Sequence, residues 1–304
     1  MKKITKIIHC IVVKTKAEEF FVHLRQRSNL VRKFIPVSFR HLFASFGRFI
    51  PPSTDYPKDD YYSVTRDNTH FRINRSDYVQ WRLFYGVRDN ALLEAKRFLT
   101  NNSIVLDIGA NFGAFSLRLA RHALENNYAN IHVHAFEPNP FILLNYNDNL
   151  ALNSEMMPII HLHGVGLGNE TGERSFYFEG RNTGVGRVMR SEGAGQFNVT
   201  LQRLDDFISE LNPARIAFIK LIAGGFEPEI LKGGWNTIKK YKPPIFFEVT
   251  KTWWGEHNYT IEEVIGALAG LGYRFRIEHY NEMRPYEPSK YASRFQFNLL
   301  GTVG

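Results

Sequence analysis

The sequence predicts an α/β domain in which a mostly parallel sheet is covered by helices on both faces. From residue 104 onward, three short apolar segments predict strands: SIVLDIGAN, IHVHAFEP and MPIIHLHGVGLG. The segments between them, FGAFSLRLARHALEN and NPFILLNYNDNLALN, carry the spacing of amphipathic helices. This βαβαβ order implies a parallel sheet with right-handed crossovers.

The remaining elements follow from the same patterns. ERSFYFEG and FNVTLQRL predict an inserted β-hairpin, interrupted by a glycine-rich stretch, and LDDFISEL predicts a helix. Four more strands are predicted at IAFIKLI, PPIFFEVT, GYRFRIEHY and RFQFNLLGT, with the helix IEEVIGALAGLG between the second and third. Upstream, THFRINRSDYVQWRLFYG predicts one or two short strands and a turn, and RDNALLEAKRFLT predicts a helix.

The positive charge of the chain is concentrated at its N-terminus. The 304 residues have a formal net charge of +8, yet residues 1–50 contain eleven Lys and Arg against only Glu18 and Glu19. IPPSTDYPKDDYYS, residues 50–63, breaks the helical pattern and indicates a linker. We therefore predict a basic helical N-terminal arm with its linker over residues 1–60, and one domain over residues 61–304.

Two interpretations of the arm stay open. Its mixture of aromatic and basic residues suits an anionic membrane surface, bound through residues 1–50, but a solvated helical hairpin packed on its own domain, or a flexible arm, is the favoured interpretation. Nucleic-acid binding is not expected, because it would depend on the arm alone. The apolar run from Ile7 to Val13 is too short to span a bilayer, and the single cysteine excludes an internal disulfide. These features favour a cytoplasmic protein, peripheral at the membrane if the arm binds there; the oligomeric state is not determined by the sequence.

The motif VLDIGANFGAF, residues 105–115, carries most of the functional information. A buried strand ends in an acid, and a glycine-rich turn then leads into a helix, where exposed N–H groups favour an anionic ligand. The second strand ends at Glu137, a position suited to a ribose diol. Together these features predict a nucleoside-bearing cofactor, whereas the alternative is a tight strand–helix turn with a chance Glu. The GxNxG spacing disfavours a nicotinamide dinucleotide.

Several motifs in order resemble the FkbM-type methyltransferases. They are DIGANFG, AFEPNP, NDNLALN, GLGNETGE, TLQRLDDFI and FIKL followed by GFEPEILKGG, and the resemblance covers roughly residues 80–250. It implies a Rossmann-like class I methyltransferase fold with a seven-stranded sheet, the last strand being antiparallel. It also implies S-adenosylmethionine (SAM) as cofactor and O-methylation of a hydroxyl on a sugar, glycan or secondary metabolite, so that the partner is a small-molecule or glycan acceptor.

The resemblance also implies roles for individual residues. Glu137 would hold the ribose hydroxyls, and residues around Gly164 and Val165 would border the adenine. The methionine part of SAM would be surrounded by Asp107, Gly109, Asn111 and Gly113.

The loop after the fourth strand departs from the family pattern. Such proteins typically read IK-x-D-x-E-G-F-E, but this chain has Ile222 and Gly224 in place of the two acids. The remaining positions match: Lys220, Gly225, Phe226 and Glu227. Because Mg²⁺ prefers oxygen ligands, no metal is expected in this loop. The departure also supports a second hypothesis, a catalytically impaired SAM-binding protein with a regulatory or scaffold role.

Three residues remain as catalytic candidates near this rim: Lys220, Glu227 and Glu248. Each has a structural alternative, since a lysine can form a salt bridge and an acid in the first turn of a helix serves its dipole. Substrate candidates are Asn182 and Thr183, as a flap or a plain hairpin loop, and His257, as a base or an ordinary loop histidine. The HLH sequence at 161–163 is interpreted as strand alternation and not as a metal site.

Overall fold

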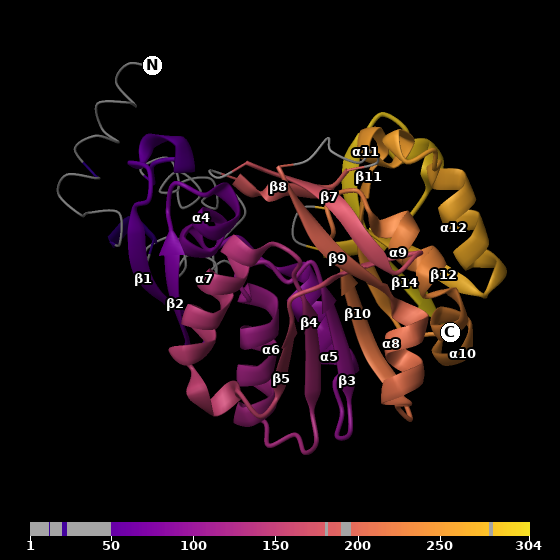
Figure 1. Cartoon of the computed structure of the whole chain (residues 1–304), viewed down its shortest axis with the longest axis horizontal. Helices are drawn as coiled ribbons and strands as arrows, with labels where there is room; N and C mark the ends of the chain where they lie inside the picture. The colour runs from indigo at the N-terminus through magenta and orange to yellow at the C-terminus, as the bar shows by residue number, and fades with distance from the viewer. Residues whose placement is uncertain (1–11, 13–19, 23–49, 180–181, 190–195, 280–281) are drawn as a thin grey trace, which may run out of the picture. The chain divides into compact units, whose positions relative to one another are not determined.

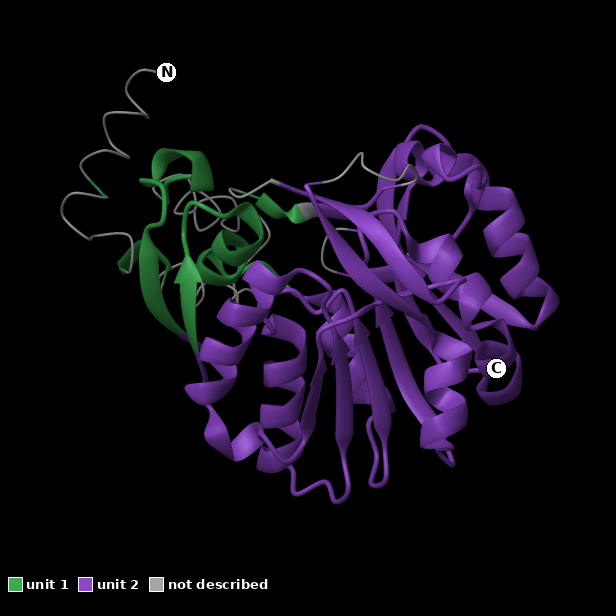
Figure 2. Cartoon of the chain, viewed as in Figure 1, with its two compact units in different colours: residues 1–64, 71–88, 180–184 green, residues 65–70, 89–179, 185–304 purple. Residues whose placement is uncertain are grey.

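The computed structural model describes residues 12, 20–22, 50–179, 182–189, 196–279 and 282–304 (Figure 1). The predicted basic arm therefore lies almost entirely outside the described residues. The chain forms two compact units, shown in Figure 2: unit 1 draws on residues 1–64, 71–88 and 180–184, and unit 2 on residues 65–70, 89–179 and 185–304. The division of the chain at residue 60 remains a prediction.

Unit 1 contains a 3₁₀-helix, most of a hairpin and a helix: η3 (Ser53–Asp55), β1 (Tyr61–Arg66), β2 (Thr69–Asn74) and α4 (Tyr78–Tyr85). The segment YVQWRLFY was expected to be extended, but it forms α4. The reason lies in its ends: the Asp77 side chain accepts from the Gln80 amide at 2.9 Å, and Gly86 closes the helix at φ 76°.

Unit 2 is built on an eight-stranded sheet in the order β13-β12-β14-β11-β10-β3-β4-β5. The strands are β3 (Ile104–Ile108), β4 (His132–Phe136), β5 (Ile160–His163), β10 (Ile216–Leu221), β11 (Ile245–Thr250), β12 (Tyr273–His279), β13 (Glu282–Pro285) and β14 (Gln296–Val303). The predicted mostly parallel sheet and the antiparallel last strand, β14, are confirmed. The expected strand number of seven was one too low, because β13 pairs antiparallel with the edge strand β12.

Helices cover both faces of this sheet. They are α5 (Asn90–Phe98), α6 (Ala114–Glu125), α7 (Pro140–Ala151), α8 (Leu204–Leu211), α9 (Glu227–Gly233), α10 (Trp235–Tyr241), α11 (Lys251–Glu256) and α12 (Ile261–Gly270). The rings of Phe98 and Phe115, from α5 and α6, stack on Phe218 of β10. On the opposite face, Phe207 of α8 packs edge-on against Phe136 of β4. No helix among the described residues is long and apolar enough to cross a membrane.

A second sheet, in the order β6-β9-β7-β8, replaces the predicted simple hairpin. Its strands are β6 (Gly166–Gly168), β7 (Gly172–Glu179), β8 (Asn182–Val188) and β9 (Phe197–Arg203). The predicted antiparallel pairing of β7 with β9 is present. The glycine-rich stretch contributes β8, and the expected long third strand breaks at Gly164, so that β6 joins this sheet.

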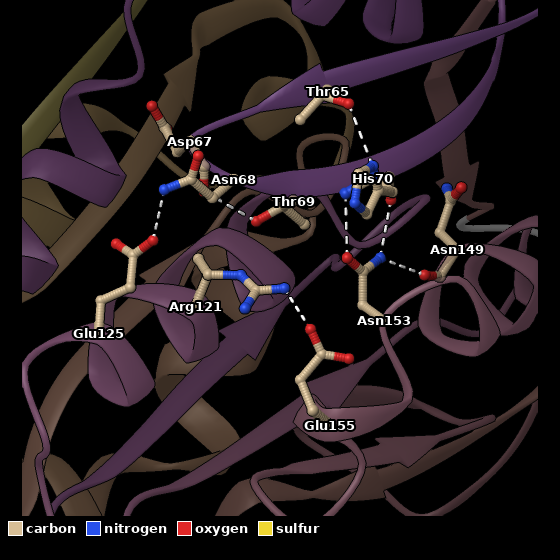
Figure 3. Close-up of polar contacts among 10 residues, drawn as sticks. All are labelled: Thr65, Asp67, Asn68, Thr69, His70, Arg121, Glu125, Asn149, Asn153 and Glu155. Atoms are coloured by element: carbon tan, nitrogen blue, oxygen red, sulfur yellow. Dashed lines mark hydrogen bonds and ion pairs between the residues drawn. The ribbon is translucent and has the colours of Figure 1, made fainter.

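The hairpin tip, residues 65–70, is bound to the helices of unit 2 (Figure 3). The Asn153 side chain accepts from the His70 amide at 2.9 Å and donates to the His70 carbonyl at 2.7 Å. It also donates to the Asn149 carbonyl at 2.7 Å, and the Asn149 side chain donates to the Phe112 carbonyl at 3.0 Å. Two buried asparagines of the NDNLALN motif thus connect the hairpin tip to the turn after β3.

Four histidines form a ladder on β4 and β5. Ring nitrogens of His132 and His161 are 2.9 Å apart, and those of His134 and His163 are 3.1 Å apart. Burial, together with the nearby His161, His163 and His132, lowers the pKa of His134 to about 3. The folded chain therefore holds His134 in its neutral form.

This histidine predicts a loss of stability in acid. The unfolded chain takes up a proton near pH 6.5 and the folded chain only near pH 3, so stability is complete above pH 6.5 and falls as the pH drops toward 3. Between pH 7 and pH 5.5 we expect the free energy of unfolding to fall by about 1 kcal/mol from this residue, after allowance for solvent screening. Urea denaturation of the parent chain and of a His134→Gln variant checks this, since the variant should lose less stability over the interval. Equal losses would contradict it.

Candidate active site

The turn after β3 has a backbone that glycine makes possible. Residues 109, 111 and 113 have φ angles of 75°, 50° and 88°. The amides of Gly109 and Ala110 both donate to the Phe136 carbonyl, at 3.0 and 2.9 Å. A Cβ atom on Gly109 would lie 1.8 Å from the Ile222 carbonyl oxygen, so this position accepts only glycine. The turn is therefore held between the ends of β4 and β10.

Glu137 follows β4 and faces this turn. Its carboxylate accepts from the Asn111 amide at 2.9 Å and from the Asn139 amide at 3.0 Å. Burial raises the pKa of Glu137 to about 7, although both amide bonds act in the opposite direction. A carboxylate with two oxygens fixed in this way has remaining lone pairs that suit two neighbouring hydroxyl groups.

Asp107 and Lys220 form a buried ion pair beneath the turn. Lys220 Nζ lies 3.0 Å from Asp107 Oδ1, and the Ser116 hydroxyl donates to Asp107 Oδ2. The same ammonium donates to the Gly109 carbonyl at 2.5 Å and to the Ile108 carbonyl at 3.4 Å. Both side chains are thus engaged in joining β3, β10 and the turn.

Glu227 orders the loop after β10 from its buried side. One carboxylate oxygen accepts from the Ala223 amide at 2.7 Å, and the other accepts from the Trp254 indole at 2.9 Å. Burial, and then the charge of Glu248, raise the pKa of Glu227 to about 7. A fully buried carboxylate with these partners holds the loop in shape and is turned away from solvent.

The loop itself is tightly packed at both glycines. Gly224 has a φ of 61°, and a Cβ there would lie 2.4 Å from the Gly186 carbonyl oxygen of β8. Gly225 has a φ of 89°, and a Cβ there would lie 2.4 Å from Trp253 Cβ. Neighbouring backbone therefore occupies the space that a side chain at position 224 would need, and this chain is built around a glycine there.

Glu248 and His257 lie at the periphery of this region. Glu248, on β11, accepts from the Gln296 amide side chain at 2.8 Å. His257 follows α11, and its ring packs edge-on against Phe226 with centroids 5.2 Å apart. Val165 is half-buried on the core between β5 and β6, and Gly164 lies beside Leu143. Their assigned roles at the site remain predictions.

Asn182 and Thr183 belong to unit 1, whereas the cofactor candidates belong to unit 2. Thr183 donates to the Asp77 carboxylate through its amide at 2.6 Å and its hydroxyl at 3.1 Å. The Asn182 side chain accepts from the Gly184 amide at 3.1 Å. These contacts order the start of β8 within unit 1, and the proposed flap role stays a prediction.

The structure adds residues that the sequence patterns did not single out. Ser116 supports Asp107, while Trp254 supports Glu227, and Arg187 and Trp253 flank the glycine loop. Ser116 lies on α6 just after the glycine turn, and this position in the sequence could have identified it as a neighbour of Asp107. No sequence pattern marks Arg187 as a site residue, because only the folded second sheet brings it to the loop. In the part of the chain that is described, no three His, Cys, Asp or Glu side chains are grouped to hold a metal ion.

A family comparison decides the assignment. Residues 107–275 match the model of the methyltransferase FkbM domain, which is more than half of the chain. The chain belongs to the FkbM methyltransferase family. The matched region begins at Asp107 and includes the glycine turn, Glu137 and the loop after β10.

The chain is similar to two curated proteins and to one solved structure. AMB antimetabolite synthetase AmbE of Pseudomonas aeruginosa is 26% identical over 198 residues, which are 53% of this chain and 9% of that protein. Methyltransferase sdnD of Sordaria araneosa is 29% identical over 165 residues, 44% of this chain and 61% of that protein. The crystal structure of an FkbM methyltransferase from Methylobacillus flagellatus shares 16% identity with a TM-score of 0.45, covering 96% of this chain and 60% of that one. The FkbM chain described here thus spans less than two thirds of each.

The environment of Glu137 predicts a pH-dependent cofactor affinity. The predicted role of Glu137, accepting hydrogen bonds from ribose hydroxyls, requires the charged carboxylate, and its pKa of about 7 means that a proton must leave before binding at lower pH. We expect the affinity for S-adenosylhomocysteine (SAH) to fall by up to about tenfold per pH unit below pH 7. Calorimetric titration between pH 5.5 and 8 measures this.

The control is Glu137→Gln, which preserves the shape of the side chain and removes the titration. This variant should bind SAH weakly and with little pH dependence between pH 5.5 and 8. A variant that kept the parent pH profile would assign the titration to another group.

Proposed function

We propose that this FkbM-family protein transfers the methyl group of SAM to a hydroxyl oxygen of a sugar, glycan or secondary metabolite. The observation that carries the proposal is the pairing of Glu137 with the glycine turn, in which the carboxylate and the Asn111 amide lie 2.9 Å apart. A nucleoside with a methionine tail requires a carboxylate that accepts hydrogen bonds from its ribose diol, and a backbone that it can approach closely. The residues present therefore fit SAM.

The chain's contribution to such a reaction is positioning. Bound SAM supplies an electrophilic methyl group on a sulfonium; the acceptor oxygen bonds to that carbon, the S–C bond breaks with its electron pair going to sulfur, and the hydroxyl proton is released. Holding the reacting atoms in line accounts for much of the rate of such a displacement. In this proposal the turn at residues 109–113 and Glu137 hold the donor, and the loop after β10 faces the acceptor.

The four acid–base candidates divide into two groups in this proposal. Lys220 and Glu227 are positioning residues, because the Lys220 ammonium is bonded to Asp107 and Gly109, and both Glu227 oxygens accept bonds from the loop and Trp254. Glu248 and His257 are half-buried at the same edge and are the better candidates to receive the hydroxyl proton. No metal is required in this scheme.

A second candidate function is a SAM-binding protein with impaired catalysis. It is favoured by the loop sequence, in which Ile222 and Gly224 replace two family acids. The packing around Gly224 weakens this candidate, since the absent glutamate leaves no gap between the loop and β8. The loop therefore packs closely against β8 without a side chain at position 224.

Labelled SAM distinguishes the two functions. We expect the parent chain to bind SAH and to label hydroxyl acceptors in a panel of methyl glycosides and phenols. Ile222→Asp restores one acid at a half-buried position, and under the proposed activity it should change turnover by less than about tenfold.

If the parent protein methylates no acceptor and the Ile222→Asp variant does, the result would favour the SAM-binding protein with impaired catalysis. Absence of SAH binding would contradict both functions. The change Gly224→Glu is unsuitable as the restoring variant, because its strained φ and the Gly186 carbonyl would cost about 1–3 kcal/mol of stability.

We also propose a cytoplasmic location with peripheral binding to anionic membranes through residues 1–50. The support is the excess of nine positive charges in that segment, mixed with aromatic residues. Vesicles containing phosphatidylserine should retain the full chain at low salt and release it near 0.5 M NaCl. Removal of residues 1–50 should abolish retention; unchanged retention would reject the proposal.

A further inference from the structure

An arginine and a tryptophan flank the loop after β10 on the side of the second sheet. Arg187 lies near the end of β8, and its guanidinium carbon is 5.4 Å from the centre of the Trp253 ring. Its Nη1 atom is 2.7 Å from Glu256 Oε2. The Arg187 side chain is 23% exposed and that of Glu256 is 51% exposed, so the pair is reached from solvent on the glutamate side.

The first side-chain carbons of Arg187 and Trp253 pack against the two glycines of the loop. A Cβ on Gly224 would lie 3.2 Å from Arg187 Cβ, and a Cβ on Gly225 would lie 2.4 Å from Trp253 Cβ. The same loop also touches the turn after β3, where Gly109 abuts the Ile222 carbonyl. One loop therefore contacts Arg187, Trp253 and the turn of the proposed donor site.

The charge of Arg187 is not balanced by the loop. Residues 222–226 carry no ionisable side chain, and Glu227 is fully buried with its oxygens directed to the loop amides and Trp254. The carboxylate that meets Arg187 belongs to Glu256, whose exposure makes the ion pair weak. A carboxylate on a bound molecule can compete with it at low cost.

We propose that Arg187 and Trp253 recognise the methyl acceptor, and that this acceptor is a hydroxy acid. Its carboxylate pairs with the Arg187 guanidinium, whose planar fork matches that group, and its apolar face lies against the Trp253 ring. Its hydroxyl then points across the glycine loop toward the donor, where the oxygen takes the methyl group and loses its proton. The inference rests on the proposed methyl transfer and specifies its substrate class.

The geometry favours a carboxylate over a phosphate. Arg187 already accommodates one carboxylate, at a distance of 2.7 Å. A phosphate dianion beside Glu256 would carry two negative charges next to a third, which opposes its binding. A monoanionic carboxylate can replace Glu256 or share Arg187 with it.

Calorimetric titration of the SAH-loaded protein with 4-hydroxybenzoate and 4-hydroxybenzamide tests the inference. The two probes have the same size and hydroxyl group and differ in the charge of one substituent. We expect the acid to bind at least about tenfold more tightly than the amide, because a charged hydrogen-bonded pair is stronger than a neutral one. Equal affinities, or no binding of either probe, overturn the inference.

Three variants locate the effect. Arg187→Ala should abolish the preference for the acid, and Arg187→Lys should retain part of it, since the charge remains and the planar fork is lost. Glu256→Gln should strengthen binding of the acid by about threefold, because a competing carboxylate is removed. If Arg187→Ala fails to fold, the other two variants still test the inference, because Arg187→Lys should weaken binding of the acid and Glu256→Gln should strengthen it.

The matched control is Arg215→Ala. Arg215 directly precedes β10, at the opposite end of that strand from the loop, and donates to the Thr100 hydroxyl at 2.8 Å. Its replacement should leave the acid preference unchanged, whereas a loss there equal to that of Arg187→Ala would assign the effect to general charge.

SAH affinity, measured in the same variants, separates this inference from the proposed function. It should be unaltered in Arg187→Ala, Arg187→Lys and Glu256→Gln. Normal SAH binding without acid preference rejects the hydroxy-acid site alone, whereas absence of SAH binding in the parent rejects the proposed methyl transfer.

Discussion

The buried ion pair between Lys220 and Asp107 is the interaction on which the rest of the site depends. It joins β10 to β3 at the ends of both strands, and the same ammonium holds the Gly109 carbonyl. A buried charge is stable only when it is fully paired, so neither side chain can be lost alone without a large penalty. The pair thereby converts two neighbouring strand ends into one rigid platform for the glycine turn.

Two further carboxylates extend this platform in different ways. Glu137 binds the amide of Asn111 and so fixes the turn from the side of β4, while Glu227 binds the amide of Ala223 and fixes the loop after β10. Burial raises both pKa values to about 7, which places these acids near the middle of the physiological pH range. Each acid orders a loop, and Glu137 is the one that is predicted to bind the cofactor.

Close packing around its two glycines explains how the loop after β10 can lack the family's acids and leave no cavity at these positions. Gly224 lies directly under the Gly186 carbonyl, and Gly225 lies directly against Trp253. Side chains at these positions would displace β8 and α11, so the acid-free loop and the second sheet are adapted to each other. The second sheet also brings Arg187, which is distant in the sequence, next to the loop after β10. Hydrogen bonds of Asn149 and Asn153 also connect the turn after β3 to the hairpin tip.

The sequence by itself determined the parallel sheet, the glycine turn and the position of Glu137, because these depend on local periodicity and on backbone angles that few residues adopt. It was misleading for α4, where the capping residues Asp77 and Gly86 outweighed an extended-looking aromatic pattern, and for β13, a short edge strand with weak alternation. Only the tertiary structure decided which polar groups are engaged. The structure shows the buried partners of Lys220 and Glu227, whose predicted catalytic roles stay predictions, and it brings Arg187 of the second sheet against the loop after β10. Such contacts arise between residues far apart in the chain, and no local pattern encodes them.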